Sequence, residues 1–320
     1  AHTSPCWSSP AQLSQPVAVM ARAHKWRRAA FAVAIAAVGL ELLYVVSGNI
    51  VLATGLPERL ANQRPEVIQL SYRWAFTPWP GRVYARDVAF RFQDRNVAFS
   101  FAMATSRLDI AMTDLFSRKL CVKHARGTDL SYRMLLKVDS VEGTEERILA
   151  FPLLSGVARP ALRPAEVAEP ALSAEEIARL WSLEFNDIES EVSEVWLFEY
   201  RYRGRGHSNG SFSVAPMRQL WVGPVSLTLE EGELTVGRHL VSERFSLHSD
   251  ATLTPISISK APGLEMFGAI TGTVRFELPL SSLELLTVYL PGATARGRGT
   301  LTGDLSMKDG RLEPTSVLKA

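Results

Sequence analysis

The sequence predicts a mainly β protein: an N-terminal transmembrane helix, then a curved antiparallel sheet that forms a groove and carries one short inserted helix. A long uncharged segment near the N-terminus predicts the first part, and apolar residues at every second position predict the second. The 320 residues are 47% hydrophobic and 21% charged, which excludes a largely disordered chain. A net charge of +2 excludes a dedicated nucleic-acid binder, and two cysteines exclude a disulfide-rich scaffold.

Residues 29–56 form the predicted transmembrane anchor, with Glu41 as the one charged residue in this range. A carboxylate inside a span costs about 2.5–3.5 kcal/mol, which the surrounding aliphatic side chains offset. Because such a carboxylate is costly, Glu41 is also a candidate functional residue. Two alternatives stay open, namely the buried core helix of a soluble protein and a cleaved signal peptide.

Basic residues precede the anchor, whereas the charges after it cancel. The positive-inside rule then predicts a single-pass protein with a cytoplasmic N-terminus and the remaining chain on the far side. Residues 1–28 are predicted to be a disordered, basic cytoplasmic leader. Residues 1–19 differ in composition from the residues after them, and Met20 opens a normal basic leader. We expect translation to start at Met20, and the alternative is that residues 1–19 are a disordered tail.

Two regions of alternating sequence are predicted to be β-sheet, at 57–138 and 191–320, with a single turn at 114–119. The second region ends soon after a hairpin, which predicts an unpaired last strand in a truncated sheet. Between the two regions, residues 139–190 are rich in proline, alanine and glutamate and are predicted to be an insertion. Within it, Ser173 and Glu176 have the spacing of a capping box and predict one short helix over 173–183.

The alternating apolar residues of the first β region need a partner, because an uncovered antiparallel sheet hides only one of its faces. A second sheet would give a sandwich; otherwise the apolar floor of a groove would accept acyl chains. The predicted floor consists of Phe99, Phe101, Met103, Leu108, Ile110, Met112, Tyr132 and Met134. Candidates for binding lipid head groups are Arg201, Arg203 and Arg205, which lie beside two tyrosines; a solvated strand face is the alternative.

No motif in the sequence predicts catalysis, a metal site or a cofactor. The six histidines lack metal-ligand spacing, and His124 is expected to be a packed or surface residue. The segment 204–210 imitates a dinucleotide-binding loop, but its third glycine is one place late, so we expect a flexible hairpin tip. Ser257 and Lys260 have the Ser-x-x-Lys spacing without the partner motifs of that enzyme class.

Two blocks of sequence resemble AsmA-like proteins of Gram-negative envelopes, including the TamB relatives. In the first, residues 47–133, an anchor is followed by Pro80-Gly81-Arg82-Val83 and a strand–strand–Asp-Leu-Phe–strand order. In the second, residues 295–314, alternate glycines precede a hairpin at 307–312. The resemblance implies an inner-membrane anchor, a periplasmic β-groove, and a role in phospholipid movement or outer-membrane assembly. The 139–190 insertion is not part of the family pattern.

The sequence therefore favours a non-enzymatic, inner-membrane-anchored periplasmic protein that holds acyl chains in an apolar β-groove. Its expected partners are membrane lipids and outer-membrane assembly proteins, with no nucleic acid. The main alternative is a protein-binding scaffold that pairs a partner strand with an exposed sheet edge. A hydrolase with a β-sandwich body is a weaker alternative, because catalytic triads cannot be recognised from spacing alone.

Overall fold

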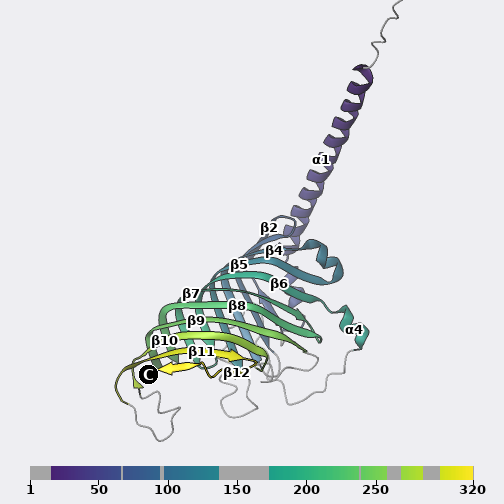
Figure 1. Ribbon diagram of the computed structural model, residues 1–320. Coiled ribbons are helices and arrows are strands. Elements are labelled where there is room, and N and C mark those ends of the chain that lie inside the picture. Colours follow the sequence, from purple (N-terminus) through teal and green to yellow (C-terminus); the bar gives the residue numbers. More distant parts are fainter. Residues whose placement is uncertain are drawn as a thin grey trace, which may run out of the picture. The chain divides into compact units, whose positions relative to one another are not determined.

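The computed structural model describes residues 16–65, 68–93, 97–136, 173–237, 239–257, 268–283 and 296–319 (Figure 1). The chain divides into two compact units, one ending at Ser47 and the other beginning at Gly48. The predicted leader before residue 16 and most of the predicted insertion lie outside the described residues.

Helix α1 (Pro16–Ala53) contains the predicted anchor. Its segment Ala30–Ala53 has 24 residues and a mean hydropathy of 2.1, which is long and apolar enough to cross a membrane. At 1.5 Å per residue this segment is about 36 Å long, compared with a hydrocarbon core of about 30 Å. None of the segment is buried, so the alternative of a soluble core helix finds no support.

The expectation of a disordered leader is wrong for residues 16–28, because the helix already begins at Pro16. The alanine, methionine, lysine and arginine residues of this stretch are good helix formers, and they extend the apolar helix toward the N-terminus. Beyond the apolar segment, Gly55 adopts a left-handed conformation (φ 66°) and starts the short helix α2 (Leu56–Ala61).

The second unit is built on one 13-stranded sheet, and the predicted curved, open sheet is confirmed (Figure 1). The strand order is β1-β3-β4-β5-β6-β7-β8-β9-β10-β11-β12, with β2 also paired to β3 and β13 to β11. The strands are β1 (Ile68–Ser71), β2 (Trp74–Trp79), β3 (Arg82–Gln93), β4 (Val97–Ile110), β5 (Lys119–Leu136), β6 (Ser182–Leu197), β7 (Tyr200–Ala215), β8 (Gln219–Val236), β9 (His239–Ser257), β10 (Ile270–Leu280), β11 (Gly299–Lys308), β12 (Arg311–Leu312) and β13 (Val317–Lys319).

One pair of strands departs from the predicted antiparallel arrangement, since β5 and β6 are parallel. Parallel neighbours need a crossover of a dozen or more residues, because the chain must return to the end of the sheet where it started. The segment between Leu136 and Ser182 supplies that crossover. It includes helix α4 (Ala174–Arg179), whose predicted capping box is confirmed: Ser173 Oγ accepts from the Glu176 N–H, and the Glu176 carboxylate accepts from the Ser173 N–H.

The predicted end of the insertion at residue 190 is too late, because β6 begins at Ser182. A register shift between Phe185 and Ile188 interrupts the alternation of β6, which hides the start of the strand in the sequence. The predicted turn at 114–119 is a 3-10 helix, η1 (Met112–Ser117).

A line of irregular pairing crosses the sheet from β3 to β9, and we call this line the crease. Asp87 in β3 and Asp129 in β5 have positive φ angles and stand at the same level on either side of Ala104. The line continues as register shifts at Gly127/Leu130, Val192/Glu194, Arg203/Gly206 and Leu229/Gly232. Because irregular residues bend strands, the crease divides the sheet into two parts.

The two parts of the sheet share one apolar face, which we call the inner face. Its core lies along the crease and includes Val195, Tyr202, Leu229 and Leu234, all of which are buried. Residues from both sides of the crease join this single cluster, among them Leu227 and Tyr132. The bend therefore turns the same face of both parts toward a common interior.

Short strands occupy both edges of the sheet. β1 and β2 together flank β3, and β12 and β13 together flank β11. The expectation of an unpaired last strand is wrong for the described residues, since β13 pairs with β11 from Thr302 to Asp304. Short edge strands are a common protection against uncontrolled strand addition.

Candidate functional site

Aromatic side chains cover the inner face on the β1 side of the crease. The rings of Phe90 and Phe101 are stacked with centroids 5.1 Å apart, and those of Phe92 and Phe99 are 5.2 Å apart. On the next strand, Tyr132 is paired with Phe101, and Met134 with Phe99. Since directly paired residues share a face, β3, β4 and β5 together present a continuous apolar surface.

The predicted floor residues Met103, Leu108 and Ile110 have different positions relative to the crease. Met103 Sδ lies 2.4 Å from the place that a Cβ on Gly127 would occupy, so these two residues face the same way. Gly127 in β5 is paired with Ser106 in β4, so Ser106 lies on the same inner face. Leu108 is two residues beyond Ser106 in β4 and also lies on the inner face. Ser106 and Leu108 have even numbers, whereas Phe99 and Phe101 have odd numbers, so the alternation changes phase within β4.

Seven of the predicted floor residues belong to strands, and the eighth does not. Met112 is the first residue of η1 and lies beyond the end of β4, so its assignment to a strand is wrong. The cause is local: the register shifts between Asp109 and Ile110, and the Ala111 N–H donates to the Cys121 carbonyl, which ends the alternation. All eight side chains are half-buried.

Much of the inner face lies outside the residues predicted from the sequence. Phe90 and Phe92 alternate with polar residues in β3, which is a readable signal. Further residues come from β6 to β11, and their register shifts obscured which face each would take. The buried and partly buried members on these strands include Val192, Leu197, Val236, Leu247, Phe276, Leu278 and Leu301.

Tyr202 fills the interior at the crease. Its side chain is 2% exposed, and its ring lies 6.1 Å from that of Phe245 in an edge-on arrangement. The Tyr202 hydroxyl is 2.7 Å from the Arg205 carbonyl oxygen and 2.8 Å from that of Glu230, so its proton is shared between them. Burial raises the pKa of Tyr202 to about 12, with a further contribution from the charge of Glu230. The inner face is thus closed at the crease.

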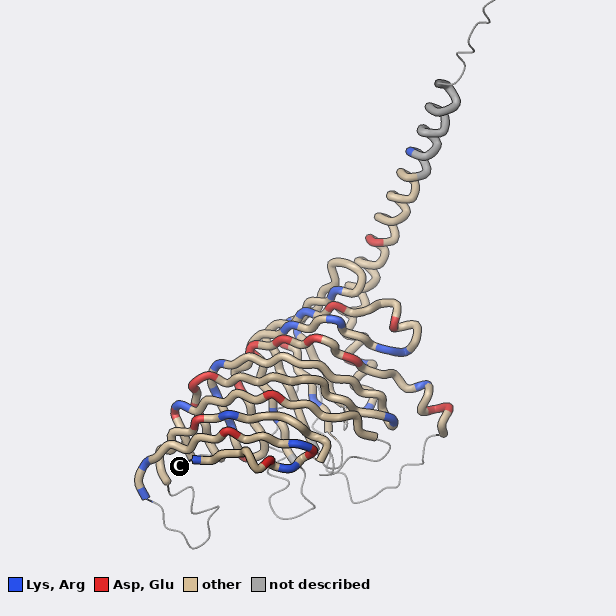
Figure 2. The backbone as a smooth tube through the Cα atoms, viewed as in Figure 1, with Lys and Arg blue, Asp and Glu red and all other residues tan. Residues whose placement is uncertain are grey.

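The opposite, outer face of the sheet is polar and carries ion pairs between neighbouring strands. Figure 2 shows Lys, Arg, Asp and Glu distributed over successive strands of the sheet. The pairs include Arg82–Asp109 at 2.6 Å, His124–Asp187 at 2.7 Å, Arg126–Glu189 at 2.9 Å and Arg275–Asp304 at 3.3 Å. This places His124 at the surface, as expected. The outer face is mainly polar, but it is not exposed throughout, since Arg91, Ser100 and Leu135 on this face are buried.

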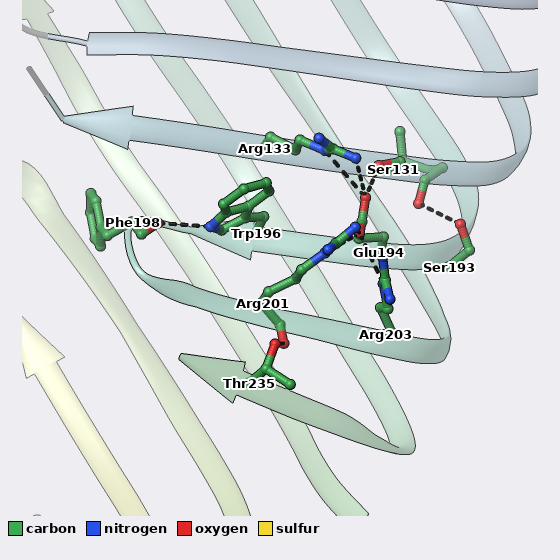
Figure 3. Close-up of polar contacts among 10 residues, drawn as sticks. Ser131, Arg133, Ser193, Glu194, Trp196, Phe198, Arg201, Arg203 and Thr235 are labelled. Carbon is green, nitrogen blue, oxygen red and sulfur yellow. Dashed lines mark hydrogen bonds and ion pairs between the residues drawn. The ribbon is translucent and has the colours of Figure 1, made fainter. Parts of the chain in front are cut away.

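Two of the predicted head-group residues meet at Glu194 (Figure 3). The Glu194 carboxylate accepts from Ser131 Oγ at 2.6 Å and from Arg133 Nη2 at 2.9 Å. Arg201 forms an ion pair with the same carboxylate, and Arg203 Nε lies 3.4 Å from it. Arg205 is exposed, and among the described residues the arginine partners of Glu194 are Arg133, Arg201 and Arg203.

The arginines hold Glu194 in its ionised form. Burial by itself would raise the pKa of this carboxyl group, but the hydrogen bond from Ser131 and the charges of Arg133 and Arg201 lower it to about 2. The guanidinium groups of Arg133 and Arg201 each lie 5.2 Å from the Trp196 ring. Trp196 is in β6, and the two arginines come from its neighbours β5 and β7. With their charges directed at Glu194 and Trp196, Arg133 and Arg201 act as cross-links between β5, β6 and β7.

A hollow of about 740 Å³ is lined by residues of β3 to β7 and by Trp74 of β2, which pairs with β3. Aromatic and charged side chains surround it. They include Trp74, Tyr84, Arg86, Arg107, Arg126, Glu189, Glu191 and His207. The Arg107 guanidinium lies 5.9 Å from the Tyr84 ring, and Thr105 and Thr128 hydroxyls meet at 2.6 Å on the floor.

The described residues give no support to a cofactor, metal or nucleophile motif. The segment 204–210 lies inside β7, so it is not a hairpin tip; Gly204 there accommodates the Tyr202 hydroxyl, 2.3 Å from its would-be Cβ. Lys260 lies outside the described residues. Within the described ranges, no three His, Cys, Asp or Glu side chains are arranged to hold a metal ion. Cys121 is buried, and burial raises its pKa, which makes it a poor nucleophile.

A scan against protein-family models found no match to this chain, and a search of curated proteins found none either.

Proposed function

We propose that this protein is a membrane-anchored lipid carrier that holds acyl chains against the inner face of its sheet and catalyses no reaction. The observation that carries the proposal is the incomplete burial of large apolar side chains on that face. Phe99, Phe101 and Met134 are only half-buried, although Tyr202 on the same face is buried. Large apolar side chains left partly uncovered in an interior favour an apolar guest.

The energetics of such binding are favourable without any specific polar contact. Each methylene group moved from water to an apolar surface contributes about 0.8 kcal/mol, so ten of them contribute about 8 kcal/mol. A sheet that is bent but not closed leaves a path by which an acyl chain enters sideways while its head group stays in water.

The proposed location is the inner membrane of a Gram-negative bacterium, with the sheet in the periplasm. The apolar helix near the N-terminus, the basic residues before it and the resemblance to AsmA-like proteins support this assignment. The proposed role is lipid transfer within the envelope or outer-membrane biogenesis, in contact with assembly proteins.

Photocrosslinking from the two faces of β4 tests the proposal. Lipid that merely surrounds the helix would copurify in any case, so the probe must report from the sheet. A benzophenone amino acid replaces Phe101 on the inner face, and the matched control replaces its neighbour Ala102, which is exposed on the outer face. Both full-length variants are expressed in cells fed with radiolabelled phosphate and are then irradiated.

The proposal requires labelled phospholipid on the position-101 variant and little or none on the position-102 variant. Equal labelling at both positions, or no labelling at 101 in a folded protein, would overturn it.

A further inference from the structure

We infer that β2 and α2 form a surface that inserts into the head-group layer of the membrane that anchors α1. This inference rests on the membrane anchoring proposed above and not on the binding of acyl chains by the sheet. We call this surface the interfacial patch, and it consists of Trp74, Phe76, Trp79, Leu56 and Leu60. All five side chains are exposed, with Trp74 and Trp79 at 50% and 49%.

The end of α1 fixes the depth of the patch. The Asn49 side chain forms two hydrogen bonds of 2.9 Å with the backbone of Thr77, donating to its carbonyl oxygen and accepting from its N–H. Asn49 lies within the apolar segment that ends at Ala53, about 6 Å from that end at 1.5 Å per residue. Thr77, in the middle of β2, is therefore held within about one helical turn of the end of the apolar segment.

Two further contacts, both made by Tyr72, attach α2 and the start of β2 to the same end of α1. The Tyr72 hydroxyl donates to the Leu52 carbonyl oxygen at 2.8 Å, and the Tyr72 N–H donates to the Glu58 carboxylate at 2.7 Å. Because Glu58 belongs to α2, both α2 and the start of β2 are fixed close to the last turn of α1. Leu56 and Leu60 are four residues apart and so share one side of α2.

The chemistry of the patch matches the lipid head-group layer. Tryptophan concentrates at this depth in membrane proteins because its ring is apolar and its N–H is polar. Trp74 and Phe76 are stacked with centroids 5.9 Å apart, and the Arg82 guanidinium lies 5.1 Å from the Trp79 ring. Arg73 and Arg86 are exposed beside β2, where they can meet lipid phosphates. Asp87 offsets part of the charge of Arg73, and Asp109 offsets that of Arg82.

Other occupants of an exposed aromatic surface are less suited to this position. A soluble protein partner would have to approach a surface held at the level of the bilayer boundary by Asn49. The patch also lacks the continuous apolar area of a protein interface, since the buried, polar Thr77 separates its aromatic residues. Contact with phospholipid head groups requires neither a shaped groove nor a large continuous apolar area.

Quenching of tryptophan fluorescence by brominated lipid tests the inference. The full chain is reconstituted in vesicles of phosphatidylethanolamine and phosphatidylglycerol that contain phosphatidylcholine brominated at acyl carbons 6 and 7. W74F and W79F are compared with the matched control W181F, because Trp181 is as exposed as Trp79 at 49% but follows α4. The other four tryptophans, Trp7, Trp26, Trp196 and Trp221, are present in every variant.

The inference predicts that W74F and W79F each lose part of the lipid-quenched emission, whereas W181F removes only unquenched emission. It is overturned if W181F lowers the quenched emission as much as W79F does, or if neither W74F nor W79F changes it. Extraction of the vesicles with alkaline carbonate separates the two proposals. Release of the wild-type chain would refute the anchor itself, whereas retention with unchanged quenching would refute the patch alone.

Discussion

The ring of Tyr202 occupies the space in which a side chain on Gly232 would lie, with its Cε2 atom 2.4 Å from the position of that missing Cβ. The Arg203 carbonyl oxygen lies 2.6 Å from the same position, so neither a ring nor the backbone leaves room for a methyl group. This contact between β7 and β8 lies on the crease. It explains why position 232 in β8 is a glycine.

We therefore expect Gly232→Ala to destabilise the sheet by about 1–3 kcal/mol, since the buried ring and the carbonyl must both move. Chemical denaturation of the full chain, followed by far-ultraviolet circular dichroism, would measure the change. Gly268→Ala is the control, because nothing lies within 4 Å of a Cβ at that position. Equal stabilities of the two variants would contradict the close contact at the crease.

The pKa of Glu194 predicts a stability change in acid. Its folded-state pKa of about 2 lies below the ordinary value of 4.5, so the ionised carboxylate stabilises the folded state above pH 4.5. That stabilisation, about 3 kcal/mol from the size of the shift, is lost as the pH falls from about 4.5 to about 2. Glu194→Gln should flatten this part of the stability–pH curve.

The control for Glu194 is Glu189→Gln, which removes an ion pair with Arg126 in which both side chains are more than half exposed. Exposed pairs contribute little, so the acid part of the curve should keep its slope in this variant. Denaturant midpoints measured at intervals between pH 2 and pH 6 give both curves. A slope that survives Glu194→Gln would exclude Glu194 as its source.

A second pH dependence is expected in base. Burial raises the pKa of Tyr132 to about 12 from the ordinary value of 10, so the folded state keeps this hydroxyl protonated where the unfolded chain ionises it. The folded state then binds more protons between pH 10 and pH 12, and stability must fall as the pH rises through this range. Tyr132→Phe should reduce the fall, as measured by denaturation at pH 9 to 12.

The contradictory outcome for Tyr132 is an early ionisation. The absorbance at 295 nm of phenolate is titrated in the folded wild-type protein and in Tyr132→Phe, and the difference between the two curves reports Tyr132. A midpoint near pH 10 in that difference would mean that the Tyr132 ring is exposed to water. The inner face of the sheet would in that case be exposed to solvent at β5.

The contacts of Asn49 predict the fourth effect. Asn49→Ala leaves the N–H and carbonyl of the buried Thr77 without their side-chain partner, which costs about 1–3 kcal/mol. We expect faster proteolysis between α1 and β2 and weaker quenching of Trp79 by brominated lipid. Asn209→Ala, at an exposed position on β7, serves as the control. Unchanged proteolysis in Asn49→Ala would show that the Thr77 contact does not hold the two elements together.

The sequence was sufficient for the general fold and for part of the site. Its period-two alternation predicts the strands, its uncharged segment predicts the apolar helix, and the Ser173–Glu176 spacing predicts the cap of α4. These features depend on local sequence alone, which is why they can be recognised without a structure.

The faces of the strands could not be predicted, because they depend on irregularities that have no local signature. Leu108 and Phe101 occupy opposite phases of the alternation in β4, yet the bend at the crease gives both the same face. Aspartate at positions 87 and 129 is typical of turns, and nothing nearby indicates that both residues lie within long strands. The convergence of Arg133 and Arg201 on Glu194 likewise depends on strand pairing over long sequence separations.

The parallel pairing of β5 with β6 bears on how the molecule folds. On either side of it, successive strands are mostly joined as antiparallel neighbours, so β3 to β5 and β6 to β9 can each form from contacts close in the sequence. The β5–β6 seam instead joins Lys119 to Ser182 across a long intervening segment, and closing such a loop is entropically slow. The two groups of antiparallel strands should therefore assemble first and pair with each other last, so that the inner face becomes continuous only at the final step of folding.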